Sequence, residues 1–474
     1  MELLTVILYV YFVSFLDKPQ QDAVALSPRA IEQRAKWGIE NDELDYPVCQ
    51  TYVDSIIHMG GKLFHTSRWM NGATYEMSEE LAYRVEQLGF VTAIEATRDD
   101  SSPRYFGSPK RKIEMQPSGE ITAAASMLTD GQLNTYNLLP LHEAGFEGQG
   151  ILMAVCDGGF YNADQLTCFR QSELELGHFD FTDDTVGFYG ITGEHGTMCL
   201  STISAITDSY HGAATKAQYY LMRSEENDTE SPKEMDNLIV ALETADSLGV
   251  NVFSVSLGYA MFDNYSWDLS HRDLDGQTTR ASRAATIAAQ KGMLVCVAAG
   301  NEGSGTWKKI SVPADADSIL TVGAVNTSGT IGAFSSYGPS ADGRIKPEVC
   351  AVGVQTTLIN SSGSVVLRNG TSFATPLLAG LAASLWSALP SENAMQIRDR
   401  IIASADRVTN PDTKQYGYGI PDAWKAYTLW SEGTKEIKET TQPEVRKVLR
   451  GEDILIIRYG HVYNLAGQLL YSPL

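Results

Sequence analysis

Long apolar runs are scarce in this sequence. A transmembrane helix needs about 20 consecutive, mainly apolar residues. The run at the amino end, MELLTVILYVYFVSFLDKPQ, is too short to cross a bilayer comfortably, and no later stretch reaches that length. The sequence therefore predicts a protein without a membrane span.

Basic residues are also in short supply. The 474 residues include 36 Lys and Arg against 58 Asp and Glu, which gives a formal net charge of −22. A chain this acidic repels a phosphate backbone unless a basic stripe compensates, and none is visible, so we expect no nucleic-acid partner. With 43% apolar and 20% charged residues, the chain is typical of a globular protein, and its length predicts a main domain with additions.

Cysteine is present but not in the usual spacing of a metal site. The sequence has no Cys-x-x-Cys pair and no histidine at metal-ligand spacing, which argues against zinc. The six cysteines are Cys49, Cys156, Cys168, Cys199, Cys296 and Cys350. Cys156 and Cys296 lie in apolar runs typical of buried strands, where a free thiol behaves as a small hydrophobe. The disulfide state and the redox compartment stay open.

The amino end lacks two features of an export signal, a positively charged start and an A-x-A-like cleavage site. Two interpretations stay open. Either residues 1–21 are an atypical or partial signal, or YVYFVSFLDK is the first strand of a folded domain.

Residues 22–100 alternate between helical and strand-like patterns. SPRAIEQRAKWGI and SEELAYRVEQLG have helical spacing, whereas KLFHTSRW and FVTAIEAT are typical of strands. Four or five short elements of this kind predict a small α+β layer of the ferredoxin-like type. From Asp99 to Gln132 the residues become polar and small, which predicts an exposed and cleavable linker.

Strands and helices alternate between Gly148 and about Leu429. The expected strands are ILMAVCD, AQYYLM, NVFSVSLG, MLVCVAAGN and SILTVGAV, and the expected helices are HGTMCLSTISAI, MDNLIVALETADSLG, RAATIAAQKG and SFATPLLAGLAASLWSAL. This alternation predicts an α/β fold with a doubly wound, mostly parallel sheet. Beyond Tyr427, SEGTKEIKETTQPEV predicts a linker, and DILIIRYGHVYNLAGQLLY predicts one or two short β-hairpins.

Three residues with catalytic potential lie at the ends of predicted elements. Ser372, in G-T-S-F-A-T-P, opens a helix whose free N–H groups and dipole can stabilise negative charge, although a helix cap is the alternative. His195, in H-G-T at another helix start, has an unperturbed pKa suited to a general base, although a lone histidine in a loop is more often a solvated surface group. Asp157, in V-C-D-G-G, follows an apolar strand, where sites assemble in open sheets and where turn aspartates are also common.

The order Asp, His, Ser along the chain is one of those found for a catalytic triad. With these three motifs, the chain resembles the subtilase family over about residues 140–430. The resemblance implies a serine endopeptidase in which Asp157 orients His195, His195 is the base and Ser372 is the nucleophile. The motif A-A-G-N implies that Asn301 donates to the oxyanion, with the backbone N–H of Ser372 as its partner.

The motif S-V-S-L-G resembles the subtilase strand that pairs with an extended substrate. The resemblance therefore implies substrate binding by Ser256, Leu257 and Gly258, together with Ala299 and Gly300. It leaves the preferred substrate sequence open.

The resemblance to secreted bacterial subtilases also implies a domain plan. Residues 1–100 resemble a prodomain that acts as intramolecular chaperone and inhibitor, 101–135 a linker with the processing site, 136–430 the peptidase domain, and 431–474 a linker and short β extension. The expected partners are protein or peptide substrates and the chain's own prodomain, in a secreted or cell-envelope location. The tail resembles the last strands of a type IX secretion sorting domain, with a plain structural tail as the alternative.

No metal or cofactor is expected. Calcium is common in the family, but no acidic cluster has the spacing of an EF-hand loop. Val352 and Glu348 stand where the family usually has Pro and Asp, which concerns loop details only. Two other functions fit the sequence less well. An inactive subtilase fold normally lacks a triad member or the oxyanion Asn, and a glycosidase would not explain the three motifs.

Overall fold

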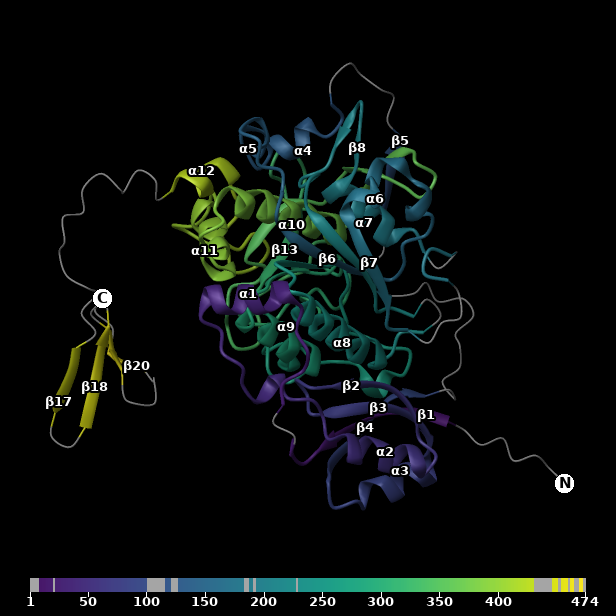
Figure 1. Ribbon diagram of the computed structural model, residues 1–474. Coiled ribbons are helices and arrows are strands. Elements are labelled where there is room, and N and C mark those ends of the chain that lie inside the picture. The colour runs from purple at the N-terminus through teal and green to yellow at the C-terminus, as the bar shows by residue number, and fades with distance from the viewer. Residues whose placement is uncertain are drawn as a thin grey trace. The chain divides into compact units, whose positions relative to one another are not determined.

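The computed structural model describes residues 8–19, 22–99, 116–120, 127–182, 187–190, 193–226 and 229–429, and four short strands nearer the carboxyl end. The chain forms two compact units, Met1–Tyr427 and Thr428–Leu474. The larger unit contains an amino-terminal domain and a main domain (Figure 1).

A seven-stranded sheet forms the centre of the main domain, and each pair of neighbouring strands is parallel. Its order is β14 (Val349–Val352), β13 (Leu320–Val325), β12 (Leu294–Ala298), β11 (Val252–Val255), β6 (Leu152–Asp157), β10 (Gln218–Arg223) and β7 (Glu175–Asp180). The predicted doubly wound α/β fold is confirmed. Two strands, β14 and β7, were not predicted from the sequence, β7 because its apolar pattern is weak.

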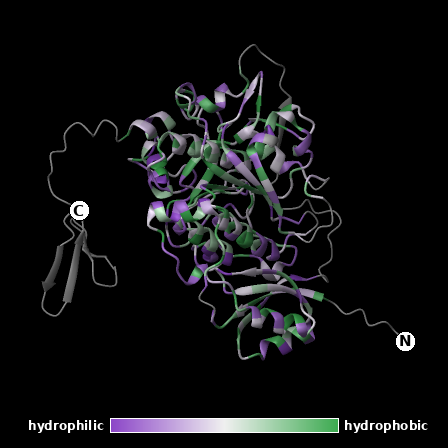
Figure 2. Cartoon of the chain, viewed as in Figure 1, coloured by the Kyte–Doolittle hydropathy of each residue, from purple (hydrophilic) through white to green (hydrophobic). Residues whose placement is uncertain are grey.

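Helices cover both faces of this sheet. Met153 and Val155 of β6 belong to the core on the side of α7 (His195–Ser204) and α10 (Thr371–Ala388). The alternate residues Leu152, Ala154 and Cys156 belong to the core on the side of α8 (Lys233–Leu248) and α9 (Arg280–Gln290). Because successive strand residues point to opposite faces and both faces are covered, β6 is apolar up to its last residue, Asp157, and Figure 2 shows hydrophobic strands between the helical layers.

The helix α10 is buried along nearly its whole length and packs against α7. Two further helices, α11 (Ala394–Ser404) and α12 (Ala423–Thr428), complete this side of the domain. No helix in the described ranges combines the length and apolar character needed to span a membrane.

The amino-terminal domain has a four-stranded antiparallel sheet in the order β2 (Lys62–Ser67), β3 (Gly72–Ser78), β1 (Leu8–Phe15), β4 (Val91–Asp99). Together with α2 (Gln50–His58) and α3 (Glu79–Glu86), it has the predicted ferredoxin-like β-α-β-β-α-β order. The helix α1 (Pro28–Trp37) is an addition between β1 and α2.

The first strand settles which interpretation of the amino end holds for residues 8–15. β1 lies between β3 and β4, and Val10, Phe12 and Val13 are almost fully buried. An export signal that included these residues would remove the central part of the sheet. Residues 8–15 therefore form the first strand of the folded domain, as the second interpretation expects, and a signal within residues 1–21 stays a prediction.

The amino-terminal domain lies against α8 and α9, with α2 and α3 on the far side of its sheet (Figure 1). Buried ion pairs join the two domains. Arg34 of α1 and Arg68 of the β2–β3 turn both contact Asp246 of α8, at 2.8 and 2.7 Å. Lys291, at the end of α9, contacts Asp45 at 2.7 Å.

Parts of the expected linker, residues 101–135, have regular structure. β5 (Gln116–Glu120) pairs with β16 (Val365–Asn369), which pairs in turn with β15 (Thr356–Ile359). The helix α4 (Asp130–Asn134) places Leu133 in the core of the main domain, so that domain already includes residues before 136. Residues 100–115 and 121–126 lie outside the described residues, and so does most of the expected processing region.

The smaller unit contains an antiparallel sheet in the order β17 (Arg446–Arg450), β18 (Asp453–Arg458), β19 (His461–Tyr463), β20 (Leu469–Tyr471). This agrees with the expected β-hairpins. The predicted charged linker at 431–445 lies outside the described residues.

Candidate active site

Asp157 is the last residue of β6 and lies at the carboxyl end of the parallel sheet. Its side chain is completely buried, and Oδ1 accepts hydrogen bonds from the backbone N–H of Gly158 at 2.8 Å and from His195 Nδ1 at 2.7 Å. The carboxylate therefore fixes both the orientation of the imidazole and the nitrogen that carries its proton.

His195 is the first residue of α7, and the glycine after it permits this placement. A Cβ atom on Gly196 would lie 2.5 Å from the carbonyl oxygen of Gly159 and 2.9 Å from Cβ of Asp157. Burial by itself would lower the pKa of His195, but the charge and hydrogen bond of Asp157 outweigh it and hold that pKa well above the usual 6.5. The H-G dipeptide thus brings helix α7 into contact with the end of β6.

Ser372 is the second residue of α10, and a proline four residues later leaves its carbonyl without the usual helical partner. Pro376 has no N–H to donate to the carbonyl of Ser372. Instead, that carbonyl accepts from the hydroxyl of Ser256 at 2.8 Å and from the thiol of Cys199 at 3.3 Å. Contacts from β11 and α7 therefore hold the first turn of α10 in place.

Cys199 and Phe373 connect Ser372 with His195. Cys199 contacts both residues, since its Sγ is also 3.8 Å from His195 Nδ1, and the ring of Phe373 lies 5.5 Å from the imidazole. Ser372 Oγ and His195 Nε2 are both buried, and neither forms a hydrogen bond with any of the described residues. Catalytic hydrogen bonds are often long in the absence of substrate. The arrangement is therefore compatible with a hydrogen bond between Ser372 and His195 that forms when substrate binds.

Asn301 lies beside the start of α10. Its Oδ1 accepts from the backbone N–H and from the hydroxyl of Thr371, both at 2.9 Å. Because the oxygen binds the helix start, Nδ2 is the part of the amide that can donate to a substrate oxygen. Within the described backbone, no hydrogen bond uses the N–H of Ser372.

The five predicted substrate-binding residues fall into two groups. Leu257 and Gly258 follow β11, and neither takes part in a hydrogen bond of the described backbone. In contrast, the N–H of Ala299 donates to Val322 and its carbonyl accepts from Ser311.

Gly300 is likewise paired within the fold, through Thr371 and Ser336. The main-chain N–H and carbonyl groups of Ala299 and Gly300 therefore already form hydrogen bonds within the fold, whereas Leu257 and Gly258 form none within the described backbone. The role of all five in substrate binding stays a prediction.

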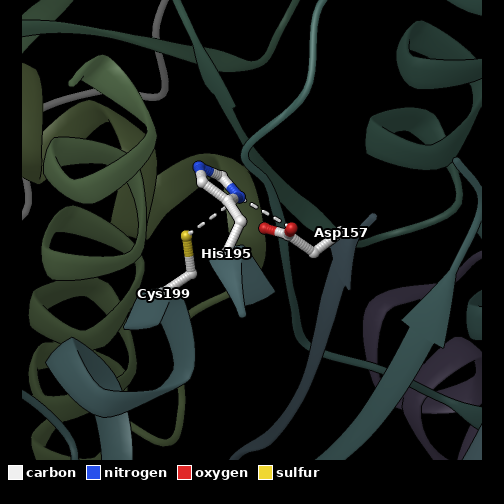
Figure 3. Close-up of side chains that lie close together, drawn as sticks. All are labelled: Asp157, His195 and Cys199. Atoms are coloured by element: carbon white, nitrogen blue, oxygen red, sulfur yellow. Dashed lines mark hydrogen bonds and ion pairs between the residues drawn. The ribbon is translucent and has the colours of Figure 1, made fainter. Parts of the chain in front are cut away.

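Two groups of side chains in the described ranges bring together enough possible ligands to hold a metal ion. The first is Asp157, His195 and Cys199, shown in Figure 3. The second is a set of three buried glutamates, Glu225, Glu230 and Glu234. Oxygen atoms of this second set already accept bonds from Tyr259 and from backbone N–H groups, so the set fits a structural role.

A place for Cys199 in the site was not predicted from the sequence. Two patterns in the sequence could have identified it: Cys199 follows His195 by four residues, and Pro376 follows Ser372 by four. The first spacing places the thiol beside the imidazole on one helix face, and the second predicts a carbonyl that needs another donor.

Comparison with known proteins gives consistent results. The model of the subtilase family matches residues 148–419, and that of the peptidase S8 propeptide domain of Bacteroidota matches residues 10–112. The chain is 28% identical to subtilisin NAT of Bacillus subtilis subsp. natto over 372 residues, which cover 77% of this chain and 83% of the relative. It is 30% identical to a subtilisin of Bacillus pumilus over 285 residues, 59% of this chain and 92% of the relative.

The family match covers more than half of the chain, and the propeptide match coincides with the domain built on β1–β4. The chain therefore belongs to the subtilase family and is a subtilisin-like serine endopeptidase that carries a propeptide domain.

Proposed function

We propose that the chain hydrolyses peptide bonds through an acyl-enzyme formed on Ser372, with Asp157 and His195 as the other members of the triad. The observation that carries this proposal is the 2.7 Å hydrogen bond between Asp157 and His195 Nδ1. It leaves His195 Nε2 as the basic nitrogen, and both this atom and the hydroxyl oxygen of Ser372 are buried.

In the proposed reaction, His195 Nε2 removes the hydroxyl proton as Ser372 Oγ attacks the scissile carbonyl. His195 then gives this proton to the leaving amine, and the acyl-enzyme remains. Water attacks the acyl group by the same route and restores Ser372. Asp157 stays ionised throughout and stabilises the imidazolium that forms in each step.

The oxyanion would be stabilised by the N–H of Ser372 and by Nδ2 of Asn301. Support comes from the two hydrogen bonds that attach Oδ1 of Asn301 to Thr371. Loss of one such donor in subtilisin lowers kcat by about 10²–10³-fold. The peptide would add as a strand along residues 256–258, where the main chain of Leu257 and Gly258 is available.

The chain is further proposed to be a self-processing zymogen that acts on proteins or peptides outside the cytoplasm, as a secreted or cell-envelope enzyme. The propeptide match supports an inhibitory prodomain. The cut would lie within residues 101–135, so the first 100 to 135 residues would be lost.

Ser372→Ala tests both parts of the proposal. We expect this variant to lose peptide hydrolysis and labelling by a fluorophosphonate probe, and to stay full length while the wild type is shortened. A matched control is Ser384→Ala, because Ser384 is buried in the same helix but donates to the carbonyl of Ala213. This control should keep labelling and processing. Turnover retained by Ser372→Ala would refute the nucleophile.

A further inference from the structure

The strand β5 pairs with the strand that leads to the candidate nucleophile. β5 lies antiparallel to β16, with Gln116 opposite Asn369 at one end and Glu120 opposite Val366 at the other. Asn369 ends β16 and lies three residues before Ser372. Because the two strands run in opposite directions, the amino end of β5 lies at the end of β16 from which the chain continues to Ser372.

The connection between β16 and Ser372 is held by the fold. The N–H of Gly370 donates to the carbonyl of Gly353 at 2.8 Å. Val366 of β16 belongs to the same buried cluster as Phe373, the residue after Ser372. β16 therefore has a fixed position relative to the nucleophile, and so has a strand that pairs with its edge.

The chain that follows β5 is attached to the same small sheet. Gln132 of α4 donates to the carbonyl of Thr357 in β15 at 3.2 Å and accepts from its N–H at 3.0 Å. Leu133 is fully buried in the core of the main domain. In contrast, the last strand of the amino-terminal sheet ends at Asp99, and the propeptide match ends at residue 112. β5 thus lies on the peptidase side of the connection between the two domains.

We propose that β5 is the first strand of the mature enzyme, and that the maturation cut leaves Gln116 within about three residues of the new amino terminus. The position of the cut rests on the proposed self-processing by Ser372. The main chain from Asn369 to Ser372 spans at most about 11 Å, because an extended residue covers at most about 3.6 Å. Three extended residues before Gln116 cover the same distance, so a carbonyl that reaches Ser372 while β5 stays paired lies about that far away.

In this arrangement β5 belongs to the leaving group of the cut. Oγ of Ser372 bonds to the carbonyl carbon of the residue before the cut, and the C–N bond breaks. His195 gives the proton that it took from Ser372 to the amine, which becomes the new amino terminus ahead of β5. Water then releases the prodomain fragment as a carboxylate. β5 stays on β16 because α4 tethers it there at a high effective concentration.

Identification of the new amino terminus tests the position of the cut. The full chain is purified, and the first shortened product in a time course is examined by amino-terminal sequencing and intact mass. We expect this product to begin at one of residues 113–116. A product that begins after Glu120 would mean that β5 leaves with the prodomain, and one that begins before residue 113 would mean that the pairing does not set the distance. Either result overturns the proposal.

An insertion separates the strand pairing from the local sequence as the cause of the cut position. Three glycines between residues 115 and 116 leave β5 and β16 unchanged. If the paired strand positions the cut, the product should keep the wild-type number of residues before Gln116. If the local sequence fixes the cut, the cut stays after the same residue and the product is three glycines heavier, which overturns the proposal.

The matched control places the same three glycines between Glu120 and residue 121. Here β5 keeps its register on β16, so the cut should stay at the wild-type bond and the product should carry all three glycines. A cut that moves in this control would show that the pairing does not position it.

Hydrogen exchange tests whether β5 stays on β16 after the cut. The backbone amides of Val365–Asn369 are compared in the mature enzyme and in the uncleaved Ser372→Ala chain. Because β15 pairs with β16 in both forms, any difference reports on β5. We expect equal protection, and faster exchange in the mature enzyme would show that β5 leaves and is not its first strand.

Failure of the proposed function gives a different result. If Ser372 does not process the chain, the wild type and Ser372→Ala have the same length, and self-processing is refuted together with this inference, which rests on it. A cut that requires Ser372 but falls elsewhere refutes only the inference on β5.

Discussion

At the scale of single residues, the candidate site depends on a carbonyl that the helix itself cannot satisfy. Pro376 removes the N–H that would normally bond to the carbonyl of Ser372, and Ser256 and Cys199 supply the donors instead. A buried carbonyl without a partner costs about 1–3 kcal/mol, so these two contacts hold the serine at a defined place. The rigid position of Ser372 thus comes from side chains on two other elements.

The charge of Asp157 leads to a prediction on the pH dependence. Burial by itself would lower the pKa of His195, and Asp157 raises it well above 6.5. Activity requires neutral His195, so it should be lost as the pH falls through this raised pKa. In Asp157→Asn the midpoint of the acid loss of activity should move to lower pH. In addition, kcat/KM should fall by about 10⁴-fold, because Asn no longer fixes the tautomer of the His195 imidazole.

The pH profile of kcat/KM on a peptide substrate measures both effects. Asp164→Asn is the control, because this aspartate lies in the segment after β6 and its side chain is exposed. An unchanged midpoint in Asp157→Asn would show that Asp157 does not set the pKa of the base.

At the scale of elements, the starts of two helices and the end of one strand bring the site together. The sequence predicts these three places because each lies within two residues of a glycine at the boundary of a predicted strand or helix. Asp157 at the end of β6, His195 at the start of α7 and Ser372 in the first turn of α10 lie at the expected ends of these elements, and their catalytic roles stay a prediction.

Other elements could not be predicted, for physical reasons. β7 lies at an edge of the sheet and alternates half-buried with exposed residues, so its sequence lacks the apolar run of a central strand. The linker strand β5 pairs with β16, which is far away in sequence, so no local pattern indicates it. The contact of Cys199 with Ser372 also joins two distant elements and follows only from the packing of α7 on α10.

Gly196 provides a prediction at this scale. A Cβ atom at this position would lie 2.5 Å from the backbone oxygen of Gly159, and no side-chain rotation can relieve that contact. Gly196→Ala should therefore shift the first turn of α7 and move His195. Since a misplacement of about 1 Å can cost about 10²-fold in rate, we expect kcat/KM to fall by about that factor.

Steady-state kinetics and a thermal melt of the same variant measure this effect. The control is Gly187→Ala, because a Cβ atom on Gly187 meets nothing within 4 Å. Normal kcat/KM in Gly196→Ala would mean that the helix start tolerates displacement.

At the scale of the whole molecule, buried charges join the prodomain to the peptidase domain. Arg34 and Arg68 reach Asp246 of α8, and Lys291 at the end of α9 reaches Asp45 of the prodomain. Breaking such a buried pair is costly, because the partner left behind is a desolvated charge. The interface should therefore depend strongly on a few carboxylates.

Asp45 and Asp42 form a matched pair for the last prediction. Lys291 contacts both, at 2.7 and 2.8 Å, but the side chain of Asp45 is completely buried and that of Asp42 is 56% exposed. In the uncleaved Ser372→Ala chain, Asp45→Asn should lower the free energy of unfolding of the prodomain by about 3 kcal/mol. Asp42→Asn should lower it by less than about 1 kcal/mol, because the solvent screens an exposed pair.

The difference between these variants should also depend on pH. Burial by itself would raise the pKa of Asp45, but hydrogen bonds from Arg34 and Lys291 outweigh it and lower that pKa from 3.8 to about 2. A lowered pKa stabilises the folded state above pH 3.8, and this contribution disappears as the pH falls through about 2. Urea denaturation at a series of pH values measures the free energy of unfolding, and hydrogen exchange of β1 checks it at neutral pH. The loss of unfolding free energy caused by Asp45→Asn should shrink toward pH 2. If this loss of unfolding free energy stays constant with pH, Asp45 contributes to the interface by packing and not by its charge.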